Sequence, residues 1–223
     1  AVENRTLFLR AKLRALQSQI NPHFLYNTLD NIRWMCEMRR QPEISRMVSS
    51  LSQLFKLSLS ADETGLWPLS REILHIRCYL DILRVRCQDS VDFTLTIQPG
   101  LEALEVPALM LQPLVENALQ HGIQDVEHGD IRVEIEREEA CLVYRVRDNG
   151  QADAQAINQL IRGGPPPGSR KGFALQNLHE RLQLHLGPRA SLLCRSTPEG
   201  SLFELRIPLG KEEGPGDPPV YRG

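Results

Sequence analysis

The hydrophobic period of the chain changes at Val91, and this change constrains the fold more than any other feature of the sequence. Before it, apolar residues recur every three to four positions over long stretches, which is typical of amphipathic helices. After it, segments such as "VDFTLTI" and "DIRVEIERE" alternate apolar and polar residues, which is typical of half-buried strands. The sequence therefore predicts a helical region over residues 1–90 and an α+β domain over residues 91–210.

Three helical segments are expected before the change. The first carries two apolar seams on either side of Pro22, at Leu9, Leu13, Leu16 and Ile20 and then at Leu25, Leu29, Ile32 and Cys36. A proline inside a helix removes a backbone hydrogen bond, so we expect a kink there. After a break at "RRQPE", two further helices follow, one over about 44–55 and one from Ser70. Their long apolar faces find little partner surface within one chain, which predicts dimerisation into a bundle.

The second region combines strand patterns with helical ones. The strand patterns are "VDFTLTI", "DIRVEIERE", "CLVYRVRD", "SLLCRS" and "SLFELRIPL", and helical patterns cover 108–122, about 153–161 and 174–186. This mixture predicts an α+β sandwich, with a mixed, mostly antiparallel sheet and helices on one face. Residues 211–223, "KEEGPGDPPVYRG", are charged and rich in proline and glycine, which is typical of a flexible tail.

Composition excludes several classes of protein. The formal net charge of −2 argues against a nucleic-acid binder, which needs a basic face. The five cysteines are scattered without a CxxC pair, which favours reduced thiols in the cytoplasm over disulfides or a zinc site. No apolar run reaches the roughly 18 residues of a membrane span. Because the chain starts abruptly in a helical pattern, we expect it to be the soluble part of something longer.

Three polar stretches interrupt the second region. "LMLQPLVENALQHG" places Glu116, Asn117 and His121 on an otherwise apolar helix, and "RVRDNG" ends a strand in Asp-Asn-Gly. "GGPPPGSRKGFALQNLHERL" is a basic, glycine-rich loop that leads into a helix N-terminus, where free N–H groups and the helix dipole favour anions. Taken singly, they are also explained as a satisfied core polar group, a turn and a mobile surface loop.

The order and spacing of the three stretches resemble the N, G1 and G2 boxes of the GHKL (Bergerat) ATP-binding fold. "QINPHFLYNTL", followed by "LQPLVENALQHG" and "NLHERL", resembles sensor histidine kinases of the LytS/YesM type, over nearly all of residues 10–209. The resemblance implies ATP-dependent autophosphorylation of a histidine and transfer to an aspartate of a response regulator. It also implies ATP and Mg²⁺ as cofactors, a homodimer, and a membrane sensor region missing from the N-terminus, which would place this chain on the cytoplasmic side.

The resemblance assigns roles to individual residues. His23 would accept the phosphoryl group, and Asn27, one helical turn later, would orient water to dephosphorylate the regulator. An imidazole suits this role because it is nucleophilic and largely neutral near pH 7. Asn117 would coordinate Mg²⁺ on the ATP phosphates. Glu116 beside it has two open roles, to polarise His23 or to shape the metal shell.

For the nucleotide, Asp148 would accept a hydrogen bond from the adenine amino group, and Gly150 would let the backbone approach the base. The segment 163–172 would form a lid over the phosphates. The remaining nucleotide contacts implied by the resemblance are His121, Arg170, Lys171, Gly172, Ala174 and Leu175.

The sequence departs from the family pattern at several positions. Gln120 replaces an expected lysine, which removes one positive charge from the phosphate site. Ala152 and Ala174 stand where glycines are usual, and alanine resists positive φ. All three changes predict weaker ATP binding. These changes leave open a degenerate kinase that acts as a regulatory dimeric interaction module. A GHKL ATPase or a serine/threonine-type kinase is the second alternative, but Pro113 stands where such ATPases carry a water-activating glutamate. Phe24 follows the histidine, where many other histidine kinases carry an acid that serves as a base; kinases of the LytS/YesM type generally lack that acid too.

Overall fold

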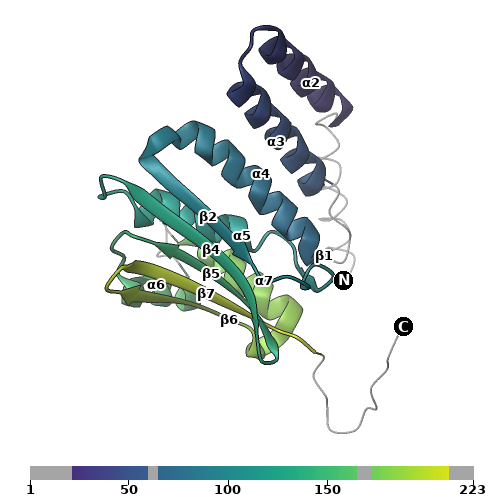
Figure 1. Ribbon diagram of the computed structural model, residues 1–223. Coiled ribbons are helices and arrows are strands. Elements are labelled where there is room, and N and C mark those ends of the chain that lie inside the picture. The colour runs from purple at the N-terminus through teal and green to yellow at the C-terminus, as the bar shows by residue number, and fades with distance from the viewer. Residues whose placement is uncertain (1–21, 60–64, 165–171, 211–223) are drawn as a thin grey trace. The chain divides into compact units, whose positions relative to one another are not determined.

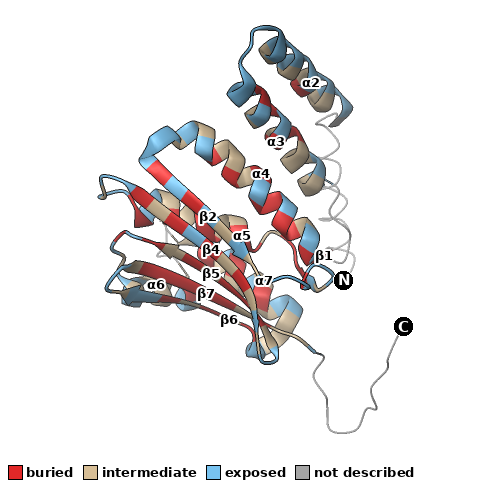
Figure 2. Cartoon of the chain, in the orientation of Figure 1, coloured by how far each residue is buried: buried red, intermediate tan, exposed pale blue. Residues whose placement is uncertain are grey.

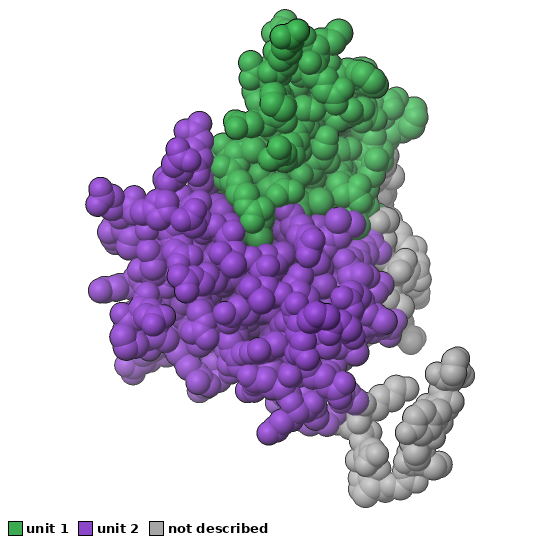
Figure 3. All heavy atoms as spheres, viewed as in Figure 1, with its two compact units in different colours: residues 1–60, 78–86 green, residues 61–77, 87–223 purple. Residues whose placement is uncertain are grey.

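A computed structural model describes residues 22–59, 65–164 and 172–210 (Figure 1). Contacts along the chain divide it into two compact units, one of residues 1–60 and 78–86 and one of residues 61–77 and 87–223 (Figure 3). The helical seam before Pro22 and the tail at 211–223 lie outside the described residues, as do Arg170 and Lys171 of the lid. The predicted domain boundaries at residues 90 and 210 stay predictions.

The first unit contains a helical hairpin of α2 (Pro22–Met38) and α3 (Pro42–Leu59). The break predicted at "RRQPE" is present, and Arg40 has a φ of 54° in the turn. Leu29 and Val48 are buried in the hairpin, and the Lys56 ammonium lies 5.4 Å from the centre of the Tyr26 ring. Large apolar side chains that stay exposed on α2 and α3 are Phe24, Ile32, Trp34, Met35, Met38, Ile44 and Leu59.

Helix α4 (Leu69–Cys87) contributes residues to both units. It begins one residue before the predicted start at Ser70, and the short turn η1 (Gln88–Ser90) follows it. Two three-residue strands that the sequence did not reveal, β1 (Leu66–Pro68) and β3 (Glu105–Pro107), pair antiparallel beside its first turn. Three residues are too few to show an alternating pattern.

A five-stranded sheet forms the centre of the second unit. Its strands are β2 (Val91–Ile97), β4 (Gly129–Glu138), β5 (Cys141–Asp148), β6 (Ser191–Thr197) and β7 (Gly200–Pro208). The strand order is β2-β4-β5-β7-β6, in which β2 and β4 run parallel and every other pair is antiparallel. The predicted α+β class, with a mixed and mostly antiparallel sheet, is confirmed.

Helices cover one face of this sheet (Figure 1). They are α5 (Leu111–Asn117), the π-helical turn η2 (Ala118–Gly122), α6 (Ala154–Gly163) and α7 (Phe173–Leu186), which ends in the turn η3 (Gly187–Arg189). The single helix predicted over 108–122 is therefore an α-helix that widens into a π-turn, where the N–H of Ile123 donates to the carbonyl of Ala118 at 3.0 Å. Such turns are frequent at functional sites.

The two faces of the sheet differ in polarity because side chains alternate along each strand. Buried residues run along the strands of the sheet (Figure 2). On the helix side they include Ile131, Val133 and Tyr144, which are fully buried. The opposite face carries a network of charges around Arg145, which forms ion pairs with Glu136, Glu138 and Glu204. All five cysteines are free. Among the helices of the described ranges, none has the length and apolarity that crossing a membrane requires.

Candidate active site

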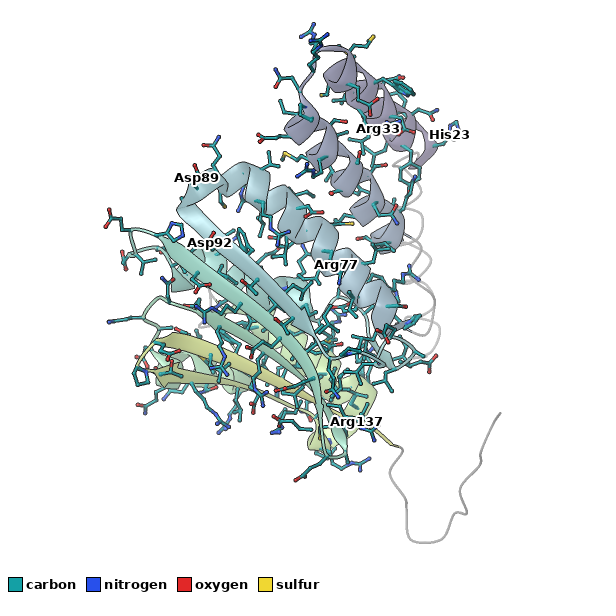
Figure 4. All side chains as sticks on the ribbon, in the orientation of Figure 1. His23, Arg33, Arg77, Asp89, Asp92 and Arg137 are labelled. Atoms are coloured by element: carbon teal, nitrogen blue, oxygen red, sulfur yellow. The ribbon has the colours of Figure 1, made fainter. Side chains whose placement is uncertain are left out.

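His23 lies in the first turn of α2, and its side chain is exposed. In Figure 4 the His23 ring projects from α2 on the side away from α3. One turn later, the Asn27 amide nitrogen lies 3.2 Å from Nδ1 of the imidazole. Residues four apart on a helix share a face, so this contact follows directly from the sequence spacing. The ring is therefore held on an accessible helix face with one nitrogen against an amide.

Asp148 is the last residue of β5, and its side chain faces the helices because it stands opposite the buried Ile131. Only 4% of the residue is exposed. Its Oδ1 accepts a hydrogen bond from the N–H of Gly150 at 3.1 Å, whereas its buried Oδ2 has no hydrogen-bond partner within the described ranges. Burial raises the pKa of Asp148 from 3.8 to about 6, against the opposing effects of the Gly150 N–H and the Ser201 hydroxyl.

Two glycines allow the backbone to close around this carboxylate. The π-turn η2 brings Gly122 so near that a Cβ there would lie 2.5 Å from Oδ1 of Asp148. A Cβ on Gly150 would lie 1.5 Å from the carbonyl oxygen of Gly122. Position 150 therefore requires glycine because its backbone packs against η2. This reason is separate from the expected approach of the Gly150 backbone to the adenine base. The role of Gly122 was not identified from the sequence.

Asn117 is the last residue of α5, at the junction with η2, and is half-buried. Glu116 beside it accepts a hydrogen bond from the Gln112 amide at 2.7 Å, which orients its carboxylate along the helix. In the described part of the chain, no cluster of three or more His, Cys, Asp or Glu side chains is arranged to hold a metal. Mg²⁺ in nucleotide sites usually takes one or two carboxylates and completes its shell from phosphates and water, so the Asn117 amide oxygen would supply a single, uncharged ligand of such a shell.

The start of α7 contains the remaining predicted nucleotide contacts that the structure describes. Gly172 has a φ of 82°, and Ala174 follows it in the first turn of the helix. Neither Ala174 nor Ala152 has a positive φ, so alanine causes no backbone strain at either position. Leu175 is buried with the core-facing residues of α7, whereas His121 is exposed on η2.

Ser201 belongs to this site and was missed from the sequence. It stands directly opposite Asp148 in the pairing of β5 with β7, and only 2% of it is exposed. Its hydroxyl donates to the carbonyl of Gly150 at 3.3 Å. No local signal could have revealed it, because the serine lies 53 positions away in the sequence and meets Asp148 through strand pairing.

Two sequence families match the chain. The family described as "Histidine kinase" matches residues 11–91, and the family described as "Histidine kinase-, DNA gyrase B-, and HSP90-like ATPase" matches residues 105–211. Together the matches cover most of the chain and all of the site residues above. The chain belongs to the protein-histidine kinases, as its motifs predicted.

Among its relatives are sensor histidine kinase YesM of Bacillus subtilis (strain 168), 33% identical over 213 residues, and sensor protein LytS of Oceanobacillus iheyensis, 32% identical over 213 residues. The alignments cover 95% and 93% of this chain and 36% of each relative, so the chain spans about a third of their length. The solved structure of the Acinetobacter baumannii histidine kinase AdeS shares the fold, with a TM-score of 0.50 at 13% identity over 87% of this chain and 98% of that one.

Proposed function

We propose that this chain transfers the γ-phosphoryl group of ATP to His23 and then to an aspartate of a response regulator. The observation that carries the proposal is the buried Oδ2 of Asp148, an acceptor without a partner in the described structure. Buried polar atoms are normally hydrogen-bonded, so an unpaired one at a site of close backbone approach indicates a ligand that donates there. The exocyclic amino group of adenine is such a donor.

Around this contact, the chain supplies a small set of groups for the nucleotide. Gly122 and Gly150 leave no side chain between the backbone and the carboxylate, and Ser201 is the neighbouring hydroxyl on β7. Asn117 would hold Mg²⁺, which neutralises phosphate charge when it is bound. The lid residues and the helix N-terminus of α7 would complete the phosphate site.

In the transfer step, a lone pair of the His23 imidazole attacks the γ-phosphorus, an N–P bond forms, and the bridging oxygen leaves with ADP. Attack by Nε2 requires the tautomer that carries its proton on Nδ1. The amide nitrogen of Asn27 lies against Nδ1 in the structure. Rotation of the amide by half a turn puts its oxygen there instead, where it accepts a hydrogen bond from Nδ1–H and so stabilises this tautomer. The regulator aspartate then attacks the same phosphorus and releases neutral His23. Asn27 would also orient water for removal of the phosphoryl group from the regulator.

Glu116 is assigned to the same reaction, either as a group that polarises His23 or as part of the metal shell. Its hydrogen bond with Gln112 fixes the carboxylate on α5 beside Asn117 in both cases. The Glu116→Gln variant separates the two roles. Loss of Mg²⁺-dependent ATP affinity would assign Glu116 to the metal shell, and loss of turnover at unchanged affinity would assign it to the histidine.

We also propose that the chain is a homodimer within a longer membrane sensor. The exposed Trp34, Met35 and Met38 on α2 support dimerisation, because large apolar side chains of a short hairpin are stabilised by a partner surface. The two relatives are named as sensors and are about three times as long as this chain. This supports a longer protein in which a membrane-bound sensing region is joined to this cytoplasmic portion.

Incubation with radiolabelled ATP tests the proposed activity. The wild-type chain is expected to gain an acid-labile, alkali-stable label that passes to a receiver domain, and His23→Gln is expected to gain none. Absence of label together with absence of ATP binding would favour the degenerate, regulatory alternative. The unstrained alanines at 152 and 174 argue for an active kinase, whereas Gln120 still removes one positive charge from the phosphate site.

A further inference from the structure

A buried carboxylate from α4 holds the backbone at the start of α5. Glu72 lies in the first turn of α4 and is 1% exposed. Its Oε1 accepts from the N–H groups of Met110 at 2.7 Å and Leu111 at 2.9 Å, and its Oε2 accepts from the N–H of Leu109 at 2.8 Å. Three successive backbone donors thus share one side chain that lies 37 to 39 positions away in the sequence.

The contact replaces a local helix cap. The first N–H groups of a helix have no partner within the helix, and a Ser, Thr, Asp or Asn at its N-cap usually supplies one. In α5 the N-cap residue is Met110, whose side chain makes no such bond. Glu72 therefore caps α5 from a distant element, and a carboxylate is also favoured at this end by the helix dipole.

The residue just before the cap is strained. Leu109 has a φ of 57°, a left-handed conformation in which the Cβ of a non-glycine residue lies too close to the neighbouring carbonyl oxygen. Such conformations persist where the surroundings hold them, and they cluster at functional sites. Glu72 binds the N–H of this residue, while the Arg181 guanidinium of α7 donates to the carbonyl of Ala108. The strained backbone is thereby held from two sides.

We propose that Glu72 is a positioning residue of the nucleotide site, which keeps Leu109 left-handed and so fixes the direction in which α5 leaves the strand β3. The proposal rests on the proposed function, because α5 ends on Asn117, the expected metal-binding amide. A helix is stiff over two turns, so rotation at its first residue displaces its last. Without the carboxylate, Leu109 can relax to negative φ, and Asn117 then moves relative to Asp148.

The role differs from simple charge compensation. Burial raises the pKa of Glu72, and the three backbone N–H groups and the Arg181 guanidinium oppose this effect. If Glu72 served only to neutralise Arg181, the conformation of Leu109 would not matter for nucleotide binding. If Glu72 holds the strained residue, a residue that adopts positive φ without strain should replace its effect. Glycine is that residue.

The experiment therefore compares Glu72→Gln alone with Glu72→Gln combined with either Leu109→Gly or Leu109→Ala, all in the complete chain. The alanine variant is the matched control, since it removes the same leucine side chain but keeps the Cβ. Four quantities are measured: the Kd for ATP with Mg²⁺ by calorimetry, KM and kcat for labelling of His23, and the rate of hydrogen exchange of the amides at 109–111.

Glu72→Gln is expected to raise the Kd and KM for ATP about tenfold, which corresponds to about 1.4 kcal/mol. The amides at 109–111 exchange faster, and kcat at saturating ATP stays within about twofold of wild type. Leu109→Gly then restores most of the ATP affinity in the Glu72→Gln background, and Leu109→Ala does not. A general loss of stability would produce no such difference between glycine and alanine.

Wild-type affinity in Glu72→Gln would overturn the proposal, as would equal recovery with glycine and alanine. If Glu72→Gln does not fold by itself, the two double variants decide, and failure of the glycine double variant to fold and bind ATP also refutes the inference. A wild-type chain that binds ATP without labelling His23 would refute the proposed kinase activity alone, since the binding comparison still reports on Glu72.

Discussion

Asp148 should stabilise the nucleotide complex at the expense of the unliganded protein. Its pKa rises from 3.8 to about 6 through burial, a difference of about two pH units. At about 1.36 kcal/mol per unit, the ionised carboxylate costs the unliganded fold up to about 3 kcal/mol near pH 8. Asp148→Asn keeps the shape and the acceptor for the Gly150 N–H but removes this charge. We expect the variant to be more stable than wild type, by about 1–2 kcal/mol after its own unpaired amide is counted.

The pH dependence follows from the direction of the shift. Because the folded pKa lies above the unfolded one, the wild-type carboxylate destabilises the protein progressively as pH rises from about 3.8 to about 6, and the full cost remains above that range. The cost of the wild-type charge is therefore largest at pH 8 and falls to roughly half at pH 5. Because the cost of the variant's own unpaired amide does not change with pH, the net advantage of Asp148→Asn should fall to about zero at pH 5. Urea unfolding at both pH values measures it, and calorimetry at pH 8 should show strongly reduced ATP binding by the variant.

Removal of the Asp148 charge is expected to raise the stability of the protein and to lower its affinity for ATP. A variant that is less stable than wild type at pH 8 would show that the carboxylate is satisfied in the unliganded fold. A stability difference that is equal at pH 5 and pH 8 would show that the pKa of Asp148 is not raised. Unchanged ATP affinity would remove the carboxylate from the adenine contact and with it the main support for the proposed function.

Three further predictions concern other parts of the protein. Gly150→Ala should lower the free energy of unfolding by at least about 3 kcal/mol in urea titrations, because its Cβ would lie 1.5 Å from the Gly122 carbonyl; a smaller loss would refute the backbone contact. Arg145→Met should remove the 3.1 Å partner of the buried Glu204, which keeps only Arg195 and Arg206 at 3.6 Å, and should cost about 1–2 kcal/mol while ATP affinity stays constant; parallel loss of affinity would contradict a purely structural role. Asn27→Asp places a carboxylate beside the phospho-acceptor ring, so the acid limb of the autophosphorylation rate should shift to higher pH, and an unshifted profile would contradict the contact between residue 27 and the ring.

The five strands of the large sheet could be located from the sequence, because alternation reports which face of its own strand each residue occupies. The expected segments at Val91, Asp130, Cys141, Ser191 and Ser201 all correspond to strands of the structure. Alternation does not report which strand lies beside which. The parallel pairing of β2 with β4 and the place of β7 between β5 and β6 depend on loop closure and burial over the whole unit.

The sequence by itself predicted the class of the longer helices and strands and the family, and it singled out His23, Asn117 and Asp148 as candidate site residues, because these depend on local period and on short motifs. The tertiary structure alone decided how Asp148 is buried, why Gly122 and Gly150 must be glycine, and that Ser201 stands opposite the carboxylate. It also decided that Glu72 caps a helix nearly forty residues away. Hydrogen bonds and close packing between distant segments are set by the path of the complete chain, and a local pattern contains no record of them.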